Sequence, residues 1–143
     1  MAVISYPNSQ STLTLNGYVF QHLMEGAALT LEPVNEKTSR TNSINGGLSV
    51  SGRVDGGVHN LPVMVQRHSP DDKFLNDAKN SAAPTIFDGS MKRAYFENGT
   101  SKKATTTLAS GSITVQPTTT ENNQDADNSR TYVIQFRNAV ETF

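Results

Sequence analysis

The sequence contains no cysteine and no tryptophan. The absence of cysteine excludes disulfide bonds, thiolate metal sites and a cysteine nucleophile. No apolar run approaches the roughly 18 residues that a membrane-spanning helix needs. The first ten residues, MAVISYPNSQ, lack the basic start and the apolar stretch of a secretory signal, so we expect no such signal.

Charge of either sign is also scarce. Lys and Arg number 12, Asp and Glu number 13, and the net charge at pH 7 is -1. A protein dedicated to binding duplex DNA normally carries a basic face, so this balance argues against that class.

Small polar residues take the place of the missing apolar and charged ones. Ser, Thr and Asn account for 43 of the 143 residues, whereas hydrophobic residues make up 35% and charged residues 17%. Thr favours strands, and Ser and Asn favour turns. We therefore predict a single, mainly β domain over residues 1–143, with a modest core that gains from burial against partner subunits.

Alternation of apolar and polar residues predicts where the strands lie. Residues 27–33 and 131–140 are each expected to form a strand with one buried side. Three strand pairs are expected: within 11–20 around Asn16-Gly17, between 48–54 and 58–67, and between 90–97 and 102–116 around Asn98-Gly99.

One short helix is expected between the second and the third of these strand pairs. Ser69 suits the N-cap, Pro70 suits the first helical position, and the helix should end near Asn80. The predicted fold is two packed antiparallel sheets, as a sandwich or a flattened barrel, with this one short α-helix beside them.

Two segments are too polar and too long for ordinary connections. Residues 34–47 contain only two large apolar side chains, Val34 and Ile44, and are predicted to be a mobile loop or an arm that becomes ordered against a neighbour. Residues 117–129 contain no large apolar side chain and are predicted to be a flexible loop.

No catalytic or metal-binding motif emerges. The three histidines, His22, His59 and His68, have no second ligand at a recognised spacing. Asp71 and Asp72 fit the start of a helix, and with Asp77 they do not form an EF-hand pattern. The glycines form no phosphate-binding loop, and no serine has a nucleophile motif. We therefore expect no enzyme activity and no cofactor.

Four basic residues flank two aromatic residues in the third strand pair. Lys92, Arg93, Lys102 and Lys103 lie around Tyr95 and Phe96 in the sequence. They fit a single-stranded nucleic-acid surface, a protein-binding face, or a hairpin at a sheet edge that charge protects from further pairing.

Several stretches resemble the tail tube proteins of contractile-tailed bacteriophages. They are GAALTLEP at residues 26–33, Asn35-Glu36-Lys37, the Asn45-Gly46-Gly47 turn, and RHSPDD at residues 67–72. The strand order and the last strand, residues 131–137, also resemble that family, whereas residues 97–129 match it poorly.

The resemblance implies a structural subunit of a phage tail tube with the fold shared by type VI secretion tubes. Such subunits form stacked hexameric rings, whose bore passes the tape-measure protein and then DNA and whose outer face meets the sheath. The protein would be located in the virion and assembled in the host cytoplasm, with no membrane partner.

On this hypothesis, residues divide among three surfaces. Bore-facing candidates are Thr30, Glu32, Ser49, Ser51, Arg53, Gln135 and Arg137. The inter-subunit or inter-ring arm comprises Asn35, Glu36, Lys37, Arg40, Asn42 and Ile44. Lys92, Arg93, Lys102 and Lys103 would face the sheath or protect an edge hairpin.

Three alternatives stay open at this point. A tail terminator or a baseplate tube-extension protein would share the fold but not the stacked polymer. A β-sandwich carbohydrate-binding module would normally present exposed Trp or Tyr, and this chain has no Trp and four Tyr. A small hydrolase would need a reactive pair that the sequence does not offer.

Overall fold

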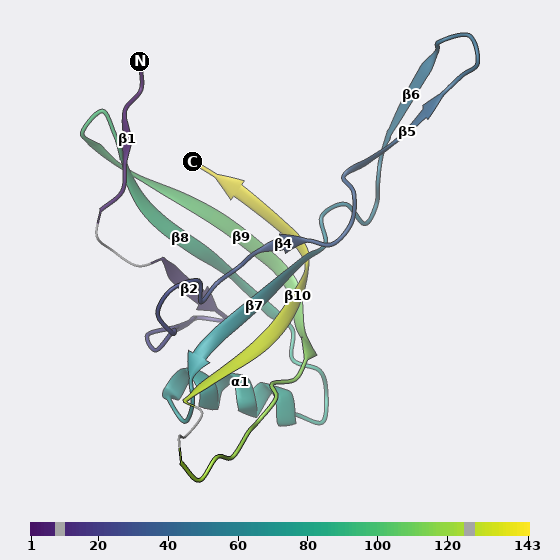
Figure 1. The fold of residues 1–143 in the computed structure, drawn as a ribbon. Coiled ribbons are helices and arrows are strands. Elements are labelled where there is room, and N and C mark those ends of the chain that lie inside the picture. The colour runs from purple at the N-terminus through teal and green to yellow at the C-terminus, as the bar shows by residue number, and fades with distance from the viewer. Residues whose placement is uncertain (8–10, 125–127) are drawn as a thin grey trace.

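The computed structural model describes residues 1–7, 11–124 and 128–143 (Figure 1). The elements are β1 (Ile4–Ser5), β2 (Thr12–Leu15), β3 (Tyr18–Val19), β4 (Glu32–Pro33), β5 (Thr38–Asn42), β6 (Leu48–Gly52), β7 (His59–Gln66), α1 (Pro70–Asn80), β8 (Phe87–Glu97), β9 (Thr100–Val115) and β10 (Ser129–Thr142). The predicted mainly β fold class, with antiparallel sheets and one short helix, is confirmed.

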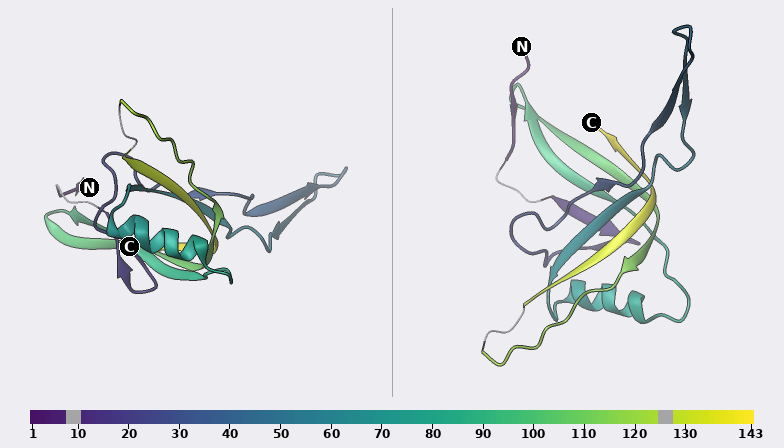
Figure 2. Two further views of the ribbon diagram at one scale, coloured as in Figure 1. Left: turned by 90° about the horizontal axis from the view of Figure 1, so that it is seen from below. Right: turned by 45° about the vertical axis from the view of Figure 1, so that its right-hand side comes forward.

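The large sheet is antiparallel, with the strand order β3-β2-β8-β9-β10-β7-β4. The short strand β1 pairs with the far end of β8. Figures 1 and 2 show β8, β9 and β10 as long, twisted strands, with α1 lying across one end of the sheet. The second sheet is the two-stranded hairpin β5-β6.

The core lies on one face of the large sheet. Because successive strand residues point to opposite faces, alternate positions of β7 and β10 enter it. Its largest fully buried side chains are Leu13, Leu15, Leu61, Val63, Val65, Leu75, Phe87, Leu108, Tyr132, Ile134 and Phe136. Leu13 and Leu15 of β2 join one cluster with β7, so the curled sheet brings its two flanks together.

The helix begins and ends where the sequence predicts. Ser69 is the N-cap, and its hydroxyl accepts a hydrogen bond from the backbone N–H of Asp72. Leu75 is fully buried, and the ring of Phe74 stacks on Tyr18 with centroids 4.5 Å apart. These contacts attach α1 to the sheet.

Two buried carboxylates fix the start of α1. Asp71 accepts hydrogen bonds from the Tyr18 hydroxyl at 2.7 Å and from the backbone N–H of His22 at 2.6 Å. Asp72 accepts from the Tyr132 hydroxyl at 2.7 Å, and the guanidinium of Arg130 lies 3.5 Å away. Neighbouring donors thus occupy both carboxylates, which anchor the helix rather than form an open reactive site.

The two Asn-Gly hairpins are confirmed. β2 and β3 turn at Asn16-Gly17, and β8 and β9 turn at Asn98-Gly99. All four turn residues have positive φ, which asparagine and glycine adopt more readily than other residues. The strand predicted over 131–140 is also confirmed as β10.

The predicted pairing of residues 48–54 with 58–67 is wrong. β6 pairs with β5, whereas β7 lies between β10 and β4. β7 and β10 each present three buried apolar side chains at alternate positions, so their pairing builds the core. Leu48 and Val50 stay exposed and have no such face to match.

Residues 27–33 form less strand than predicted. β4 contains only Glu32 and Pro33, and Leu29 makes a single bridge to Val63. Leu29 and Leu31 nevertheless pack against the core, so the predicted buried side is correct. Residues 117–124 contain no helix or strand, as expected for a loop, and residues 125–127 of the predicted loop lie outside the described residues.

Candidate assembly surfaces

The hairpin of β5 and β6 projects from the body of the protein (Figure 1). We call residues 38–52 the arm. Every residue of the arm is exposed, and the tip residue Ile44 is fully so. Gly46, at φ 82°, allows the reversal at the tip. The segment predicted to be a mobile loop or an arm, residues 34–47, contains β5, which pairs with β6 of the same chain in this hairpin.

The two faces of the arm differ in chemistry. In the register of the hairpin, Arg40 lies opposite Val50 and Asn42 lies opposite Leu48. The other face holds Ser39 opposite Ser51 and Thr41 opposite Ser49. Because directly opposite residues share a face, one face carries the two large apolar side chains with Arg40, and the other carries only hydroxyls.

Polar contacts close the base of the arm. The backbone N–H of Arg53 donates to the carbonyl of Lys37 at 3.0 Å. The Arg53 side chain lies 3.1 Å from Asp55 and 3.9 Å from Glu36, and the Asn35 amide donates to the Asp55 carbonyl. The predicted arm residues therefore split into a base (Asn35, Glu36 and Lys37) and the projecting hairpin (Arg40, Asn42 and Ile44).

The predicted bore-facing residues do not share one surface. Glu32, Asn60 and Gln135 form a polar row across β4, β7 and β10, in which Gln135 donates to Asn60 at 3.1 Å. Gln135 and Arg137 alternate with the buried side chains of β10 and so lie on the outward face.

Three of the remaining bore-facing candidates belong to the arm or its base. Thr30 is exposed just before β4, and Ser49 and Ser51 lie on the hydroxyl face of the arm. Arg53 at the arm base and Arg137 line one shallow groove.

The basic residues of the β8-β9 hairpin do not form one patch at a sheet edge. β8 and β9 are central strands over most of their length, but the pairing of β9 with β10 ends at Thr105, so Lys102 and Lys103 lie where β9 is an edge strand. Side chains that alternate along a strand point to opposite faces, which separates Lys92 from Arg93 and Lys102 from Lys103. The Lys102 ammonium lies 2.6 Å from the Glu97 carboxylate, and this contact raises the pKa of Lys102.

A second open surface lies where β8, β9 and β10 extend beyond the core. This groove has a volume of about 430 Å³, and we call it the β8 groove. Its apolar lining includes Ile4, Tyr6, Tyr95, Ala104 and Phe143, and its charged lining includes Arg93, Glu97 and Glu141. The guanidinium of Arg93 lies 5.5 Å from the centre of the Tyr6 ring. No local sequence pattern marks this groove, because its residues come together only through strand pairing.

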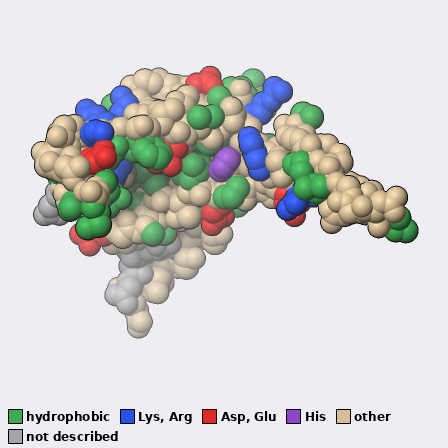
Figure 3. Space-filling model, turned by 90° about the horizontal axis from the view of Figure 1, so that it is seen from above, with side chains coloured by type: hydrophobic (Ala, Val, Ile, Leu, Met, Phe, Trp, Pro, Cys, Tyr) green, Lys and Arg blue, Asp and Glu red, His purple; other side chains and the backbone are tan. Residues whose placement is uncertain are grey.

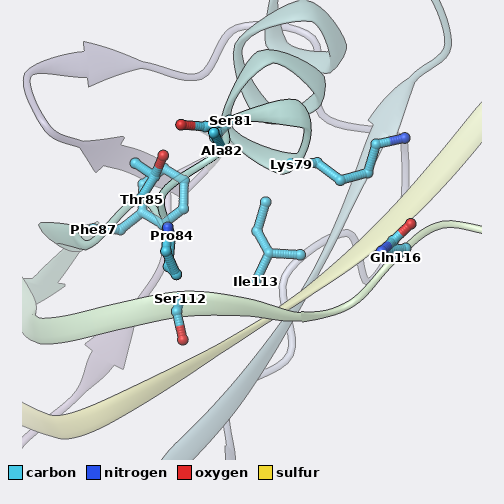
Figure 4. A pocket seen from close by; sticks show the side chains of 10 residues that line it. Lys79, Ser81, Ala82, Pro84, Thr85, Phe87, Ser112, Ile113 and Gln116 are labelled. Atoms are coloured by element: carbon cyan, nitrogen blue, oxygen red, sulfur yellow. The ribbon is translucent and has the colours of Figure 1, made fainter.

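A smaller pocket lies between the end of α1 and β9 (Figure 4). Ile113 points from β9 toward the helix, whereas the amine of Lys79 points away from it. The residues that line this pocket include no His, Asp or Glu. Over residues 1–7, 11–124 and 128–143, no three His, Asp or Glu side chains gather as a metal-binding group would.

No family model matches the chain, and no curated protein matches it. Within the described part of the chain, no helix is long and apolar enough to cross a membrane.

Proposed function

We propose that this protein is a structural subunit of a phage tail tube that assembles into stacked rings. In such a tube, the subunits enclose a bore that passes the tape-measure protein and DNA, and their outer face meets a sheath. The resemblance of residues 26–33, 35–37 and 67–72 to tail tube proteins suggests this function.

The arm is the observation that carries the proposal. A hairpin whose residues are all exposed gains little from its own chain, because isolated two-stranded hairpins are only marginally stable. Its apolar residues Leu48, Val50 and Ile44 are exposed by 53%, 55% and 101%. Contact with a neighbouring subunit would bury them, and head-to-tail contacts of this kind produce rings or open helices.

The outward face of the sheet is consistent with a water-filled bore. The row of Glu32, Asn60 and Gln135 is polar, and the chain as a whole is close to neutral. A strongly basic lining would retain DNA through counterion release, whereas a neutral polar one lets it pass.

Trimming the arm tests the proposal. Replacing residues 38–52 with Asn-Gly would join Lys37 and Arg53, which already form the closing hydrogen bond of the hairpin. We expect electron microscopy to show hollow cylinders for the full chain and only unassembled protein for the trimmed variant. Because the arm contributes nothing to the core cluster, urea unfolding should give free energies that agree within about 0.5 kcal/mol.

Three results would count against the proposal or its test. Monomers alone at high concentration of the full chain would overturn assembly itself, and single rings that never stack would instead support a tail terminator. Unfolding of the trimmed variant would show that the arm belongs to the stable body of the protein.

A further inference from the structure

We propose that the apolar face of the arm docks into the β8 groove of a second copy of this chain. The inference rests on the proposed function, because it names the contact between copies that a tube would use. It also assigns a role to each of two surfaces that the isolated chain leaves exposed.

The groove offers an aromatic surface that would receive the arm. Tyr6 and Ile4 are exposed by 65% and 47%, and Tyr95 lies on the neighbouring strand β8. In register, Ile4 lies opposite Glu97, and Arg93 lies opposite Ala104, so β1, β8 and β9 form one floor. Adjacent exposed apolar side chains of this kind mark an interaction site more often than scattered single ones do.

The arm offers a matching apolar surface that would insert into the groove. Leu48 and Val50 are next-nearest neighbours on β6 and point to the same face. The five residues of β6 extend roughly 17 Å, which lets the hairpin reach well beyond its own body. The opposite face, with Ser39 and Ser51 among its hydroxyls, can remain in water.

A basic side chain on the arm and an acidic side chain in the groove, neither of them in an ion pair, make the two surfaces complementary. Arg40 is the only charged residue in 38–52, and it lies beside Val50 on the apolar face. In the groove, Glu97 is paired with Lys102, and Arg93 lies over Tyr6, which leaves Glu141. Within the part of the chain that the structure describes, neither Arg40 nor Glu141 forms an ion pair. Docking would place these opposite charges together.

The placement of the two surfaces favours a head-to-tail contact. Figure 1 shows the arm on one flank and the ends of β1, β8 and β9 on the other, and Figure 3 shows hydrophobic side chains at both flanks. With the arm and the groove on opposite flanks, a docked pair of copies still has one free arm and one free β8 groove. Such contacts continue until a ring closes or a helix grows.

Charge reversal with rescue tests the inference. We expect Arg40→Glu and Glu141→Arg each to weaken self-association by roughly 10- to 100-fold in sedimentation experiments. The double variant restores opposite charges across every contact, so its association should return to within about threefold of the original. Lys103→Glu is the control, because it reverses an exposed charge next to the groove lining but on the reverse face of β9.

Disulfide trapping gives a second readout that does not depend on charge. The chain has no cysteine, so a Val50→Cys, Ala104→Cys variant has no background thiols. Under mild oxidation we expect dimers and longer ladders on a non-reducing gel. A Ser49→Cys, Ala104→Cys variant is the matched control, because Ser49 lies on the hydroxyl face, and it should give few of them.

The outcomes separate this inference from the tube proposal. Tubes with no 50–104 cross-link and no rescue by the double variant would overturn the docking contact and leave the tube standing. Cross-linked chains without tubes would support the contact and overturn the tube. The absence of both cross-links and tubes would overturn both the docking contact and the tube proposal.

Discussion

Asp72→Asn should lower the free energy of unfolding by about 2–4 kcal/mol at neutral pH. The carboxylate is 3% exposed, and it accepts hydrogen bonds from the Tyr132 hydroxyl and the His68 backbone N–H. An amide keeps the size of the side chain but removes the negative charge beside Arg130. The partly buried guanidinium then loses its counter-ion, which costs more than the loss of an exposed pair.

Asp77→Asn on the same helix is the matched control. Asp77 pairs with Lys73 one turn away at 2.8 Å, but both side chains are exposed. We expect its loss to cost less than about 0.5 kcal/mol in urea unfolding. Equal effects of the two substitutions would show that the buried network around Asp72 does not stabilise the helix start.

The effect of Asp72→Asn should also depend on pH. Burial by itself raises the pKa of Asp72, but the Tyr132 hydroxyl, the His68 N–H and the nearby Arg130 together bring it below its usual value. The stability that this lowered pKa contributes is complete above the unfolded value, near about pH 4, and is lost as the pH falls through the folded pKa.

The difference in free energy of unfolding between the original protein and Asp72→Asn should therefore be constant from about pH 5 to 7 and shrink below about pH 4. Urea unfolding across this pH range measures it. A gap that stays constant down to pH 2 would contradict the lowered pKa. The Tyr132 hydroxyl, with its pKa raised to about 12 by burial and by Asp72, stays protonated throughout.

Local chemistry allowed much of the sheet to be predicted from the sequence. The Asn16-Gly17 and Asn98-Gly99 turns need positive φ, and few other residue pairs supply it so readily. The alternation through Tyr132, Ile134 and Phe136 predicts a half-buried strand, and all three side chains are fully buried. Ser69 and Pro70 likewise mark the helix start through cap chemistry that needs no tertiary contact.

Strand partners were harder to predict, because alternation shows which face is apolar but does not identify the neighbouring strand. Residues 48–54 alternate as a core strand would, yet Leu48 and Val50 lie on the exposed arm. The Asn45-Gly46 turn was a signal for the pairing of β5 with β6, but the polar strand β5 offered no apolar pattern to support it.

The candidate surfaces were predictable to different degrees. Residues 34–47 are strongly polar, so they are expected to lie at the surface of the chain whether or not a neighbouring subunit contacts them. The β8 groove combines Tyr6, Tyr95 and Glu141, which are far apart in the sequence and meet only through the pairing of β1, β8, β9 and β10. No local pattern identifies such a surface.

Gly89→Ala should destabilise the protein by about 3 kcal/mol or more. A methyl group at this position would lie 1.8 Å from the carbonyl oxygen of Thr14 and 3.0 Å from the Cα of Leu15. Both atoms belong to the backbone of β2, so no side-chain rotation relieves the contact. β2 would have to move from β8, and the fully buried Leu13 and Leu15 would move with it.

Two other glycine substitutions give a graded comparison by urea unfolding. At Gly111 the added methyl group would lie 2.3 Å from the Phe136 ring, which belongs to a side chain and not to the backbone, so Gly111→Ala should cost about 1–3 kcal/mol. At Gly52, in the arm, nothing lies within 4 Å, and Gly52→Ala should change stability by less than about 0.5 kcal/mol. If Gly89→Ala were as mild as Gly52→Ala, β2 would not be held closely against β8. The sheet would then tolerate a wider separation of β2 from β8, although this separation would displace the buried Leu13 and Leu15.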